Sequence, residues 1–357
     1  MIRVYEPFIS KNQKKYVNEA LDSNFLSYHG PFEKQFENTL KEYLRIKHVI
    51  LTCNGTTSLF AAYQTIFHSK PKTFVITPTL TYASTVNQLV LAGYRPLYLD
   101  CDKNFQMDLN QFEHVIKTNT NISGVVVANL YSDSPNMNII SKLCIENNIP
   151  LIEDAAEAFG CWKNGKAIGT FGDVGSFSFF ANKIITTGEG GCLVTNNDDM
   201  AKKMKAFTTC NTTGGYKHDG IGANYRLAHL QAALGCGQLE DINEIISRKK
   251  RIAQYYRENL KYEAIVPAWV DDSSEWLPVF KLPTECYSHF REYCYENGVE
   301  VRPAFYPLHE MPGFDGYCPY PLKNALDSKN HYFIPPAGPN LTLRQLDFVI
   351  KVINAYR

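Results

Sequence analysis

The chain has 357 residues, of which 45% are hydrophobic and 20% charged, and its 36 basic residues balance its 36 acidic ones. This neutral balance argues against a general binder of nucleic acids or of anionic membranes, because both need a basic excess. Apolar runs such as residues 124–130 are too short to span a bilayer. The first ten residues lack the apolar core of a secretory signal, and the ten cysteines include no C-x-x-C pair. We therefore expect a cytoplasmic protein.

Helices and strands alternate in the first part of the chain. Ser10 and Gln13 form a capping box that opens one helix, and apolar spacing predicts another over residues 32–44. Short β-rich runs predict seven strands, at residues 49–53, 74–77, 97–99, 125–130, 151–153, 175–180 and 191–195. Helical stretches lie between them, for example at residues 58–67, 82–92 and 138–147. Continuous apolar strands that alternate with helices indicate a mostly parallel sheet covered on both faces.

The pattern changes after residue 225. Residues 227–239 and 242–260 are predicted helices, and from about residue 248 short strands and helices mix between prolines. Residues 342–356 form an amphipathic terminal helix. The sequence thus predicts a large α/β domain over residues 1–247 and a smaller C-terminal α+β domain over residues 248–357.

Residues 160–167 imitate a phosphate-binding loop of the form G-x-x-x-x-G-K-[ST]. Ala167 stands where the magnesium-binding hydroxyl should be, and Gly169 and Gly172 follow in place of a helix. We therefore expect a turn between two short extended pieces. No G-x-G-x-x-G lies between a strand and a helix, and the nine histidines have no metal-ligand spacing, so we predict neither a dinucleotide nor a metal site.

Four segments place polar groups at or near the ends of predicted elements, and open α/β sheets bind ligands at the carboxyl ends of their strands. In the first, Asn54-Gly55-Thr56-Thr57 precedes a helix and could cradle an anion or simply cap the helix. In the second, Asp154 ends an apolar run. Its carboxylate there would either need a neighbouring cation or cap a helix.

The third segment holds Lys183, between a strand that contains Ser178 and a glycine-rich turn at residues 188–191. A half-buried lysine there would have a lowered pKa and could act as a Schiff-base nucleophile, whereas a solvated turn residue is the other interpretation. In the fourth, Asn224 precedes the helix at residues 227–239, and the start of that helix would by itself explain it.

Together, these segments resemble the sugar aminotransferases, enzymes of fold type I that depend on pyridoxal 5′-phosphate (PLP). The resemblance extends from residues 4–7 to residues 305–309 and the terminal helix, and it is most specific at residues 176–191 around Lys183. Within that family the chain is most similar to the perosamine synthases. The resemblance implies a homodimer whose active sites are shared between the subunits.

The resemblance also implies a role for each site residue. Lys183 would bind the PLP aldehyde and move protons, while Asp154 would keep the pyridine nitrogen protonated. Glu157 would lie near the ring hydroxyl, and Tyr82 would stack on the ring. The phosphate would be held by Gly55, Thr56, Thr57 and Ser178, with Asn224 reaching across from the partner subunit.

The implied reaction moves the amino group of L-glutamate to C4 of a nucleotide-linked 4-keto-6-deoxyhexose. The substrate-side candidates are Arg251, Arg302, Tyr306 and His309. Departures from the perosamine synthases, at residues 57–60, 128–133 and 276–279, leave two substrate series open. These are the guanosine-linked mannose series, which gives perosamine, and the thymidine-linked glucose series, which gives viosamine. Amination at C3, a PLP-dependent dehydratase and a non-catalytic sensor of the same fold are the alternatives.

Overall fold

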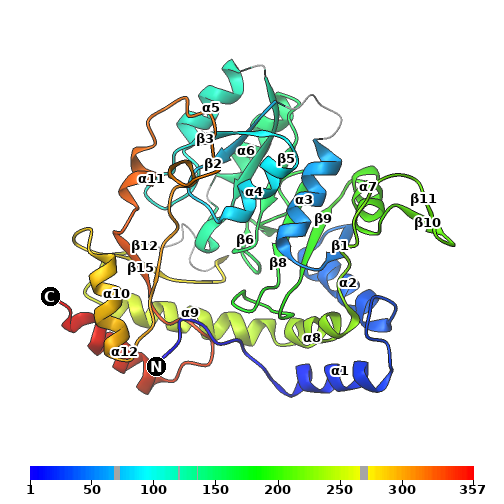
Figure 1. Cartoon of the computed structure of the whole chain (residues 1–357). Coiled ribbons are helices and arrows are strands. Elements are labelled where there is room, and N and C mark those ends of the chain that lie inside the picture. Colours follow the sequence, from blue (N-terminus) through cyan, green and yellow to red (C-terminus); the bar gives the residue numbers. More distant parts are fainter. Residues whose placement is uncertain (68–72, 120, 135, 266–271) are drawn as a thin grey trace.

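A seven-stranded sheet forms the centre of the computed structural model, which describes residues 1–67, 73–119, 121–134, 136–265 and 272–357 (Figure 1). The strand order is β1-β9-β8-β5-β4-β2-β3. The strands are β1 (His48–Thr52), β2 (Phe74–Pro78), β3 (Arg95–Leu99), β4 (Ile122–Ala128), β5 (Leu151–Asp154), β8 (Val174–Ser178) and β9 (Gly191–Thr195). Neighbours pair in parallel, except that β9 is antiparallel to both β1 and β8. The predicted mostly parallel seven-stranded sheet is therefore confirmed.

Both faces of this sheet are buried, because alternate residues of every strand except β3 enter two separate cores. Ile50 and Val126 belong to one hydrophobic cluster, and their chain neighbours Val49 and Val127 belong to the other. The first cluster includes residues of α3 (Gly55–Ile66), α4 (Ala83–Leu91) and α7 (Asp198–Thr208). The second includes residues of α2 (Pro31–Leu44), α5 (Leu109–Thr118), α6 (Met137–Glu146) and α8 (His229–Glu240). This double burial is why the strands read as continuous apolar runs.

A second, four-stranded antiparallel sheet lies in the C-terminal part, in the order β12-β13-β15-β14. Its strands are β12 (Ala264–Ile265), β13 (Val279–Lys281), β14 (Arg302–Pro303) and β15 (Tyr332–Ile334). They share a core with α9 (Ile242–Asn259), α10 (Tyr287–Glu296) and α12 (Leu343–Ala355). Figure 1 shows α8 and α9 in line along one side of the molecule, leading from the large sheet to α10 and α12. Because α9 runs through residues 247 and 248, the division of the chain there stays a prediction.

The N-terminal segment joins these two parts. Ile2 pairs with Val299 of the C-terminal part, and α1 (Lys11–Asp22) packs against α8. The capping box is present, since the Ser10 side chain accepts a hydrogen bond within the first turn of α1 and the Gln13 side chain accepts one from the Ser10 N–H. The N-terminal helix predicted from this motif is therefore confirmed.

The smaller elements connect these layers. They are the strand pairs β6 (Trp162–Lys163) with β7 (Lys166–Ala167) and β10 (Thr212–Gly214) with β11 (Lys217–His218), the short helix α11 (Lys323–Asp327), and 3₁₀ turns at Leu130–Ser132 and Leu308–Glu310. The β6–β7 hairpin turns through Asn164 and Gly165, both at positive φ. The turn expected in place of a phosphate-binding loop at residues 160–167 is confirmed.

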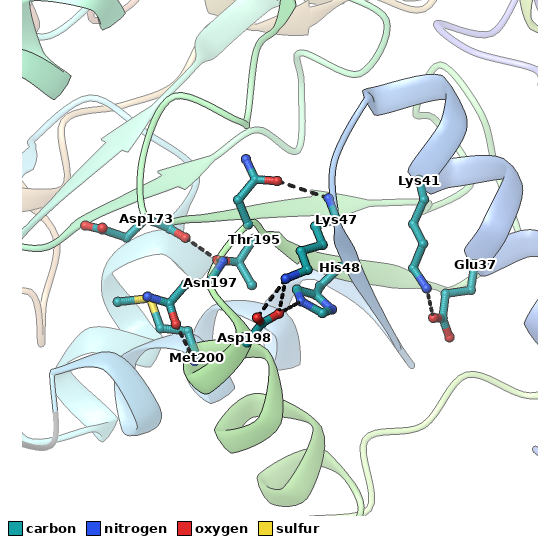
Figure 2. A network of polar contacts seen from close by, with 10 residues as sticks. Glu37, Lys41, Lys47, His48, Asp173, Thr195, Asn197, Asp198 and Met200 are labelled. Carbon is teal, nitrogen blue, oxygen red and sulfur yellow. Dashed lines mark hydrogen bonds and ion pairs between the residues drawn. The ribbon is translucent and has the colours of Figure 1, made fainter.

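A polar network fixes the start of α7 to the edge strand β1 (Figure 2). Asn197 caps α7 by accepting a hydrogen bond from the Met200 N–H at 3.0 Å. Asp198 pairs with Lys47 and with His48 at the start of β1, and hydrogen bonds from both keep the pKa of Asp198 below its usual range. The network lies on the surface and shares no residue with the cavity described below, so we assign it a structural role.

Within the described ranges, no helix combines the length and the apolar character needed to cross a bilayer.

Candidate active site

The polar segments that follow the strands meet at one edge of the large sheet. The same direction is shared by β2, β4, β5 and β8, which pair in parallel. It is also shared by β1, because β9 is antiparallel to both β8 and β1. A cavity of about 460 Å³ lies at their carboxyl ends. It is lined by eight of the predicted site residues, namely Gly55, Thr56, Tyr82, Asp154, Glu157, Ser178, Lys183 and Arg302.

Lys183 follows β8 and reaches into this cavity with its amine. Its Nζ lies 3.9 Å from Glu157 Oε1, and its main-chain carbonyl accepts a hydrogen bond from the Tyr5 hydroxyl at 2.9 Å. Burial lowers the pKa of the Lys183 amine, and the nearby Glu157 and Asp154 carboxylates oppose this shift. A lysine in this environment can supply a neutral amine as a nucleophile.

Asp154 ends β5 inside the cavity, with its carboxylate almost fully buried. Oδ2 accepts a hydrogen bond from the Thr85 hydroxyl at 2.7 Å, and Oδ1 accepts one from the Ala156 N–H at 3.2 Å. Both donors are neutral, and burial raises the pKa of Asp154. A cationic ligand atom beside this carboxylate would replace the stabilisation that burial removes.

Glu157 is held by a turn that the sequence did not predict. The strand expected over residues 125–130 ends at Ala128, and Tyr131 and Ser132 adopt positive φ angles of 51° and 64°. This turn lets the Tyr131 N–H donate to Glu157 Oε2 at 3.0 Å. Burial raises the pKa of Glu157 to about 7, against the opposing effect of Lys183. Glu157 can therefore hold or release a proton near neutral pH.

Helix α3 presents its N-terminus to the same cavity. Asn54 caps the helix, since its Oδ1 accepts from the Thr57 N–H at 2.8 Å, and Gly55 and Thr56 line the cavity wall. A Cβ atom at Gly55 would lie 2.9 Å from Ser178 Cβ, so only glycine permits this approach. The Thr56 hydroxyl bonds to Ser84, another lining residue, at 2.9 Å. The helix start and these hydroxyls suit an anion.

Five predicted site residues lie outside the cavity lining: Thr57, Asn224, Arg251, Tyr306 and His309. The Thr57 hydroxyl donates to the Asn54 carbonyl, and the Tyr306 hydroxyl donates to Asn330 Oδ1. His309 Nδ1 bonds to the Thr79 hydroxyl at 2.7 Å. Arg251 lines a separate cavity of about 440 Å³ beside α9 and the start of α12. Asn224 is exposed, and its Oδ1 accepts from Arg226 Nε, so within one chain it does not reach the cavity.

Three aromatic residues that sequence reasoning did not select complete the cavity. Tyr131 stacks on Trp276 with an interplanar angle of 20° and on Phe305 with an angle of 24°. Phe305 also approaches Tyr82, at 6.1 Å between ring centroids. In the sequence, Tyr131 and Trp276 lie in segments that differ from the perosamine synthases, at residues 128–133 and 276–279. Phe305 lies in the segment at residues 305–309 that resembles them.

This set of groups fits PLP. A buried carboxylate with neutral partners suits the ring nitrogen, the α3 N-terminus with Ser178 suits the phosphate, and the Lys183 amine lies in the same cavity. Among the described residues, no three His, Cys, Asp or Glu side chains are grouped so that they could hold a metal ion.

Comparisons with known proteins identify the family of the chain. Residues 7–354 match the model of the DegT/DnrJ/EryC1/StrS aminotransferase family. The chain is 34% identical to the GDP-perosamine synthase of Vibrio cholerae, over 100% of this chain and 99% of that protein. It also resembles the aminotransferase PseC of Helicobacter pylori, with a TM-score of 0.91 and 25% identity over 98% of this chain and 97% of that one.

A third comparison concerns the fold. An Escherichia coli GDP-4-keto-6-deoxy-D-mannose-3-dehydratase, solved with hydrated PLP, has a TM-score of 0.88 and 22% identity over 99% of both chains. PLP fold type I, predicted from the resemblance, is therefore confirmed, and PLP is the cofactor. The chain belongs to the DegT/DnrJ/EryC1/StrS aminotransferase family, and the predicted PLP-dependent sugar aminotransferase is confirmed at that level.

Proposed function

We propose that the protein transfers the amino group of L-glutamate to C4 of a nucleotide-linked 4-keto-6-deoxyhexose, with Lys183 as the catalytic amine. The observation that carries this proposal is the meeting of Lys183, Asp154 and Glu157 in one cavity at the α3 N-terminus. The relatives named GDP-perosamine synthase, from Vibrio cholerae and other bacteria, support amination of a sugar.

Each residue has a separate task in this reaction. Bound PLP supplies an electron-accepting ring that stabilises negative charge on a substrate carbon. Lys183 Nζ would hold the cofactor in the resting enzyme, and the same amine would carry a proton to and from the reacting carbon. Asp154 would keep the ring nitrogen protonated, and Glu157 would lie near the ring hydroxyl. Gly55, Thr56 and Ser178 would bind the phosphate.

Arg302 is our candidate for binding the anionic substrates. Lys183 and Arg302 are the cationic side chains that line the cavity within the described part of the chain, and Lys183 is committed to the chemistry. Both glutamate and a nucleotide diphosphate carry anionic oxygens that a guanidinium can bind in pairs. The Arg302 side chain is 47% exposed and forms a partly exposed ion pair with Glu300 at 3.7 Å, so an incoming anion would compete with Glu300 for the guanidinium.

A substrate screen tests the reaction. Purified protein with PLP and glutamate is incubated with guanosine-, thymidine- and uridine-linked 4-keto-6-deoxy sugars, and products are identified by mass spectrometry. We expect one nucleotide series to gain an amino group in equal amount to the 2-oxoglutarate formed, with ping-pong kinetics. NMR of the product then separates C4 from C3 amination.

Two outcomes would contradict the proposal. Loss of water from the sugar, without use of glutamate, would indicate a dehydratase. Absence of any product, with PLP bound normally, would favour a sensor. Lys183→Ala is the control for enzymatic turnover, and Lys166→Ala, at an exposed lysine of the β6–β7 hairpin, is its matched control.

A further inference from the structure

The indole ring of Trp276 lies directly against the Lys183 amine. Lys183 Nζ is 4.1 Å from the ring centroid, within the range of a cation–π contact. Trp276 is almost fully buried and belongs to the segment between α9 and β13, far from Lys183 along the chain. None of the cofactor contacts proposed above uses it.

Trp276 is fixed from three sides. Its indole N–H donates to the Asn182 carbonyl at 2.6 Å, and its main-chain N–H donates to Ser132 Oγ at 2.8 Å. Its ring stacks on Tyr131 at 6.2 Å between centroids. Because Asn182 immediately precedes Lys183, the indole binds the lysine segment by its edge and the lysine amine by its face.

Glu157 also approaches the amine. One oxygen lies 3.9 Å from Lys183 Nζ, and the other accepts from the Tyr131 N–H. The ring and the carboxylate therefore both contact Tyr131, so each has an anchor other than the lysine amine. Such a preformed pair suits an ammonium group.

We propose that Trp276 is a positioning residue that, with Glu157, holds the Lys183 ammonium while the lysine is not bonded to the cofactor. This rests on the proposed role of Lys183. A lysine displaced by substrate would otherwise sample many rotamers, and a proton carrier must stay within reach of the reacting carbon. The pair keeps the displaced amine at the site and favours its protonated form.

Fluorescence of the PLP-free protein tests the contact itself. Trp162→Phe with Trp269→Phe leaves Trp276 as the single tryptophan, since the chain has three. The other ionisable groups that line the cavity with Lys183 are Asp154, Glu157, Glu189, Arg302, Tyr82 and Tyr131. We expect the Trp276 emission to change with pH, with one transition lost in Lys183→Met and another lost in Glu157→Gln. A pH profile unchanged by Lys183→Met would overturn the proposal.

Kinetics test the positioning role. We expect Trp276→Leu to lower kcat roughly 2- to 30-fold, with the KM for the keto sugar and the absorption of lysine-bound PLP unchanged. Trp276→Tyr, which keeps an aromatic face, should recover part of the loss. Trp162→Phe is the matched control, because the Trp162 ring contacts Arg45 at 5.1 Å outside the cavity. Wild-type kcat in Trp276→Leu would contradict the inference alone, whereas absence of a PLP–lysine bond would contradict the proposed role of Lys183.

Discussion

At the residue scale, two adjacent carboxylates at the end of β5 have opposite surroundings. Glu153 accepts hydrogen bonds from the N–H groups of Gly169, Phe171 and Gly172 and from the Asn129 side chain, and it is fully buried. Asp154 faces the cavity with two neutral donors. Glu153 thus fixes the loop after β7, and Asp154 is left for a ligand.

These surroundings predict that removing the Glu153 charge lowers stability, whereas removing the Asp154 charge lowers activity. In Glu153→Gln an amide NH₂ would face N–H donors, so we expect a loss of about 3 kcal/mol in the free energy of unfolding. Asp154→Asn should fold normally but lose at least about a hundredfold in kcat/KM, because a neutral amide cannot balance a charged ring nitrogen. Urea unfolding of the PLP-free proteins and steady-state kinetics measure the two effects. Equal stability losses in both variants would contradict this division.

The pKa of Glu157 predicts a pH dependence of stability. In the PLP-free folded protein this pKa is raised from 4.5 to about 7. Between these values the unfolded chain has released the proton while the folded chain retains it, so stability falls as pH rises and levels off above pH 7. The stability of wild type relative to Glu157→Gln should therefore fall by about 3 kcal/mol across this window. Urea unfolding of both proteins at pH 5 and pH 8 measures it, and a constant difference would contradict the shifted pKa.

At the element scale, an ion pair from α9 supports the segment that carries Trp276. Glu275 is buried at a positive φ of 53°, which is uncommon for a residue other than glycine, and Arg257 of α9 pairs with it at 3.1 Å. Sparsely populated backbone conformations persist only when surrounding contacts fix them. We infer that α9 helps to position Trp276 in this way.

Two substitutions on α9 compare this pair with a surface pair. Arg257→Leu leaves the buried Glu275 carboxylate without its partner, so we expect a loss of about 3 kcal/mol in unfolding free energy. Arg248→Leu removes an exposed pair with Glu244 on the same helix and should cost at most about 1 kcal/mol. Chemical denaturation measures both values. Similar losses in the two variants would argue against a supporting role for the buried pair.

At the scale of the whole molecule, the position of Asn224 bears on assembly. Asn224 is exposed and does not line the cavity of its own chain. The predicted role as a phosphate ligand therefore requires a second copy of the chain, as in a homodimer with shared sites.

Mixing two inactive variants tests this arrangement. Lys183→Ala lacks the catalytic amine, and Asn224→Ala lacks the residue that we expect to serve the partner's site. Dissociating and reassociating an equal mixture would make half of the dimers mixed, each with one intact site, so activity should recover to about a quarter of wild type. Size-exclusion chromatography establishes the assembly state. No recovery from mixed dimers would show that Lys183 and Asn224 of the same chain serve one site, which would contradict a site shared between subunits.

The sequence by itself determined the order of elements and the segments that carry the chemistry. The seven strands, the capping box of α1 and the turn at residues 160–167 follow from apolar periodicity, caps and turn residues, which act over a few positions. The strand ends at Asp154 and near Lys183 follow in the same way, because parallel strands bring their carboxyl ends to one edge. The resemblance supplied the roles of these residues.

Only the tertiary structure decided which side chains meet. It placed Trp276 on the Lys183 amine and Glu157 beside it through the unpredicted turn at Tyr131, and it put Arg302 in the cavity while Arg251 lies elsewhere. No local pattern encodes these contacts, because they join segments far apart in the chain. Their geometry depends on how the helices and both sheets pack, which is a property of the whole folded chain.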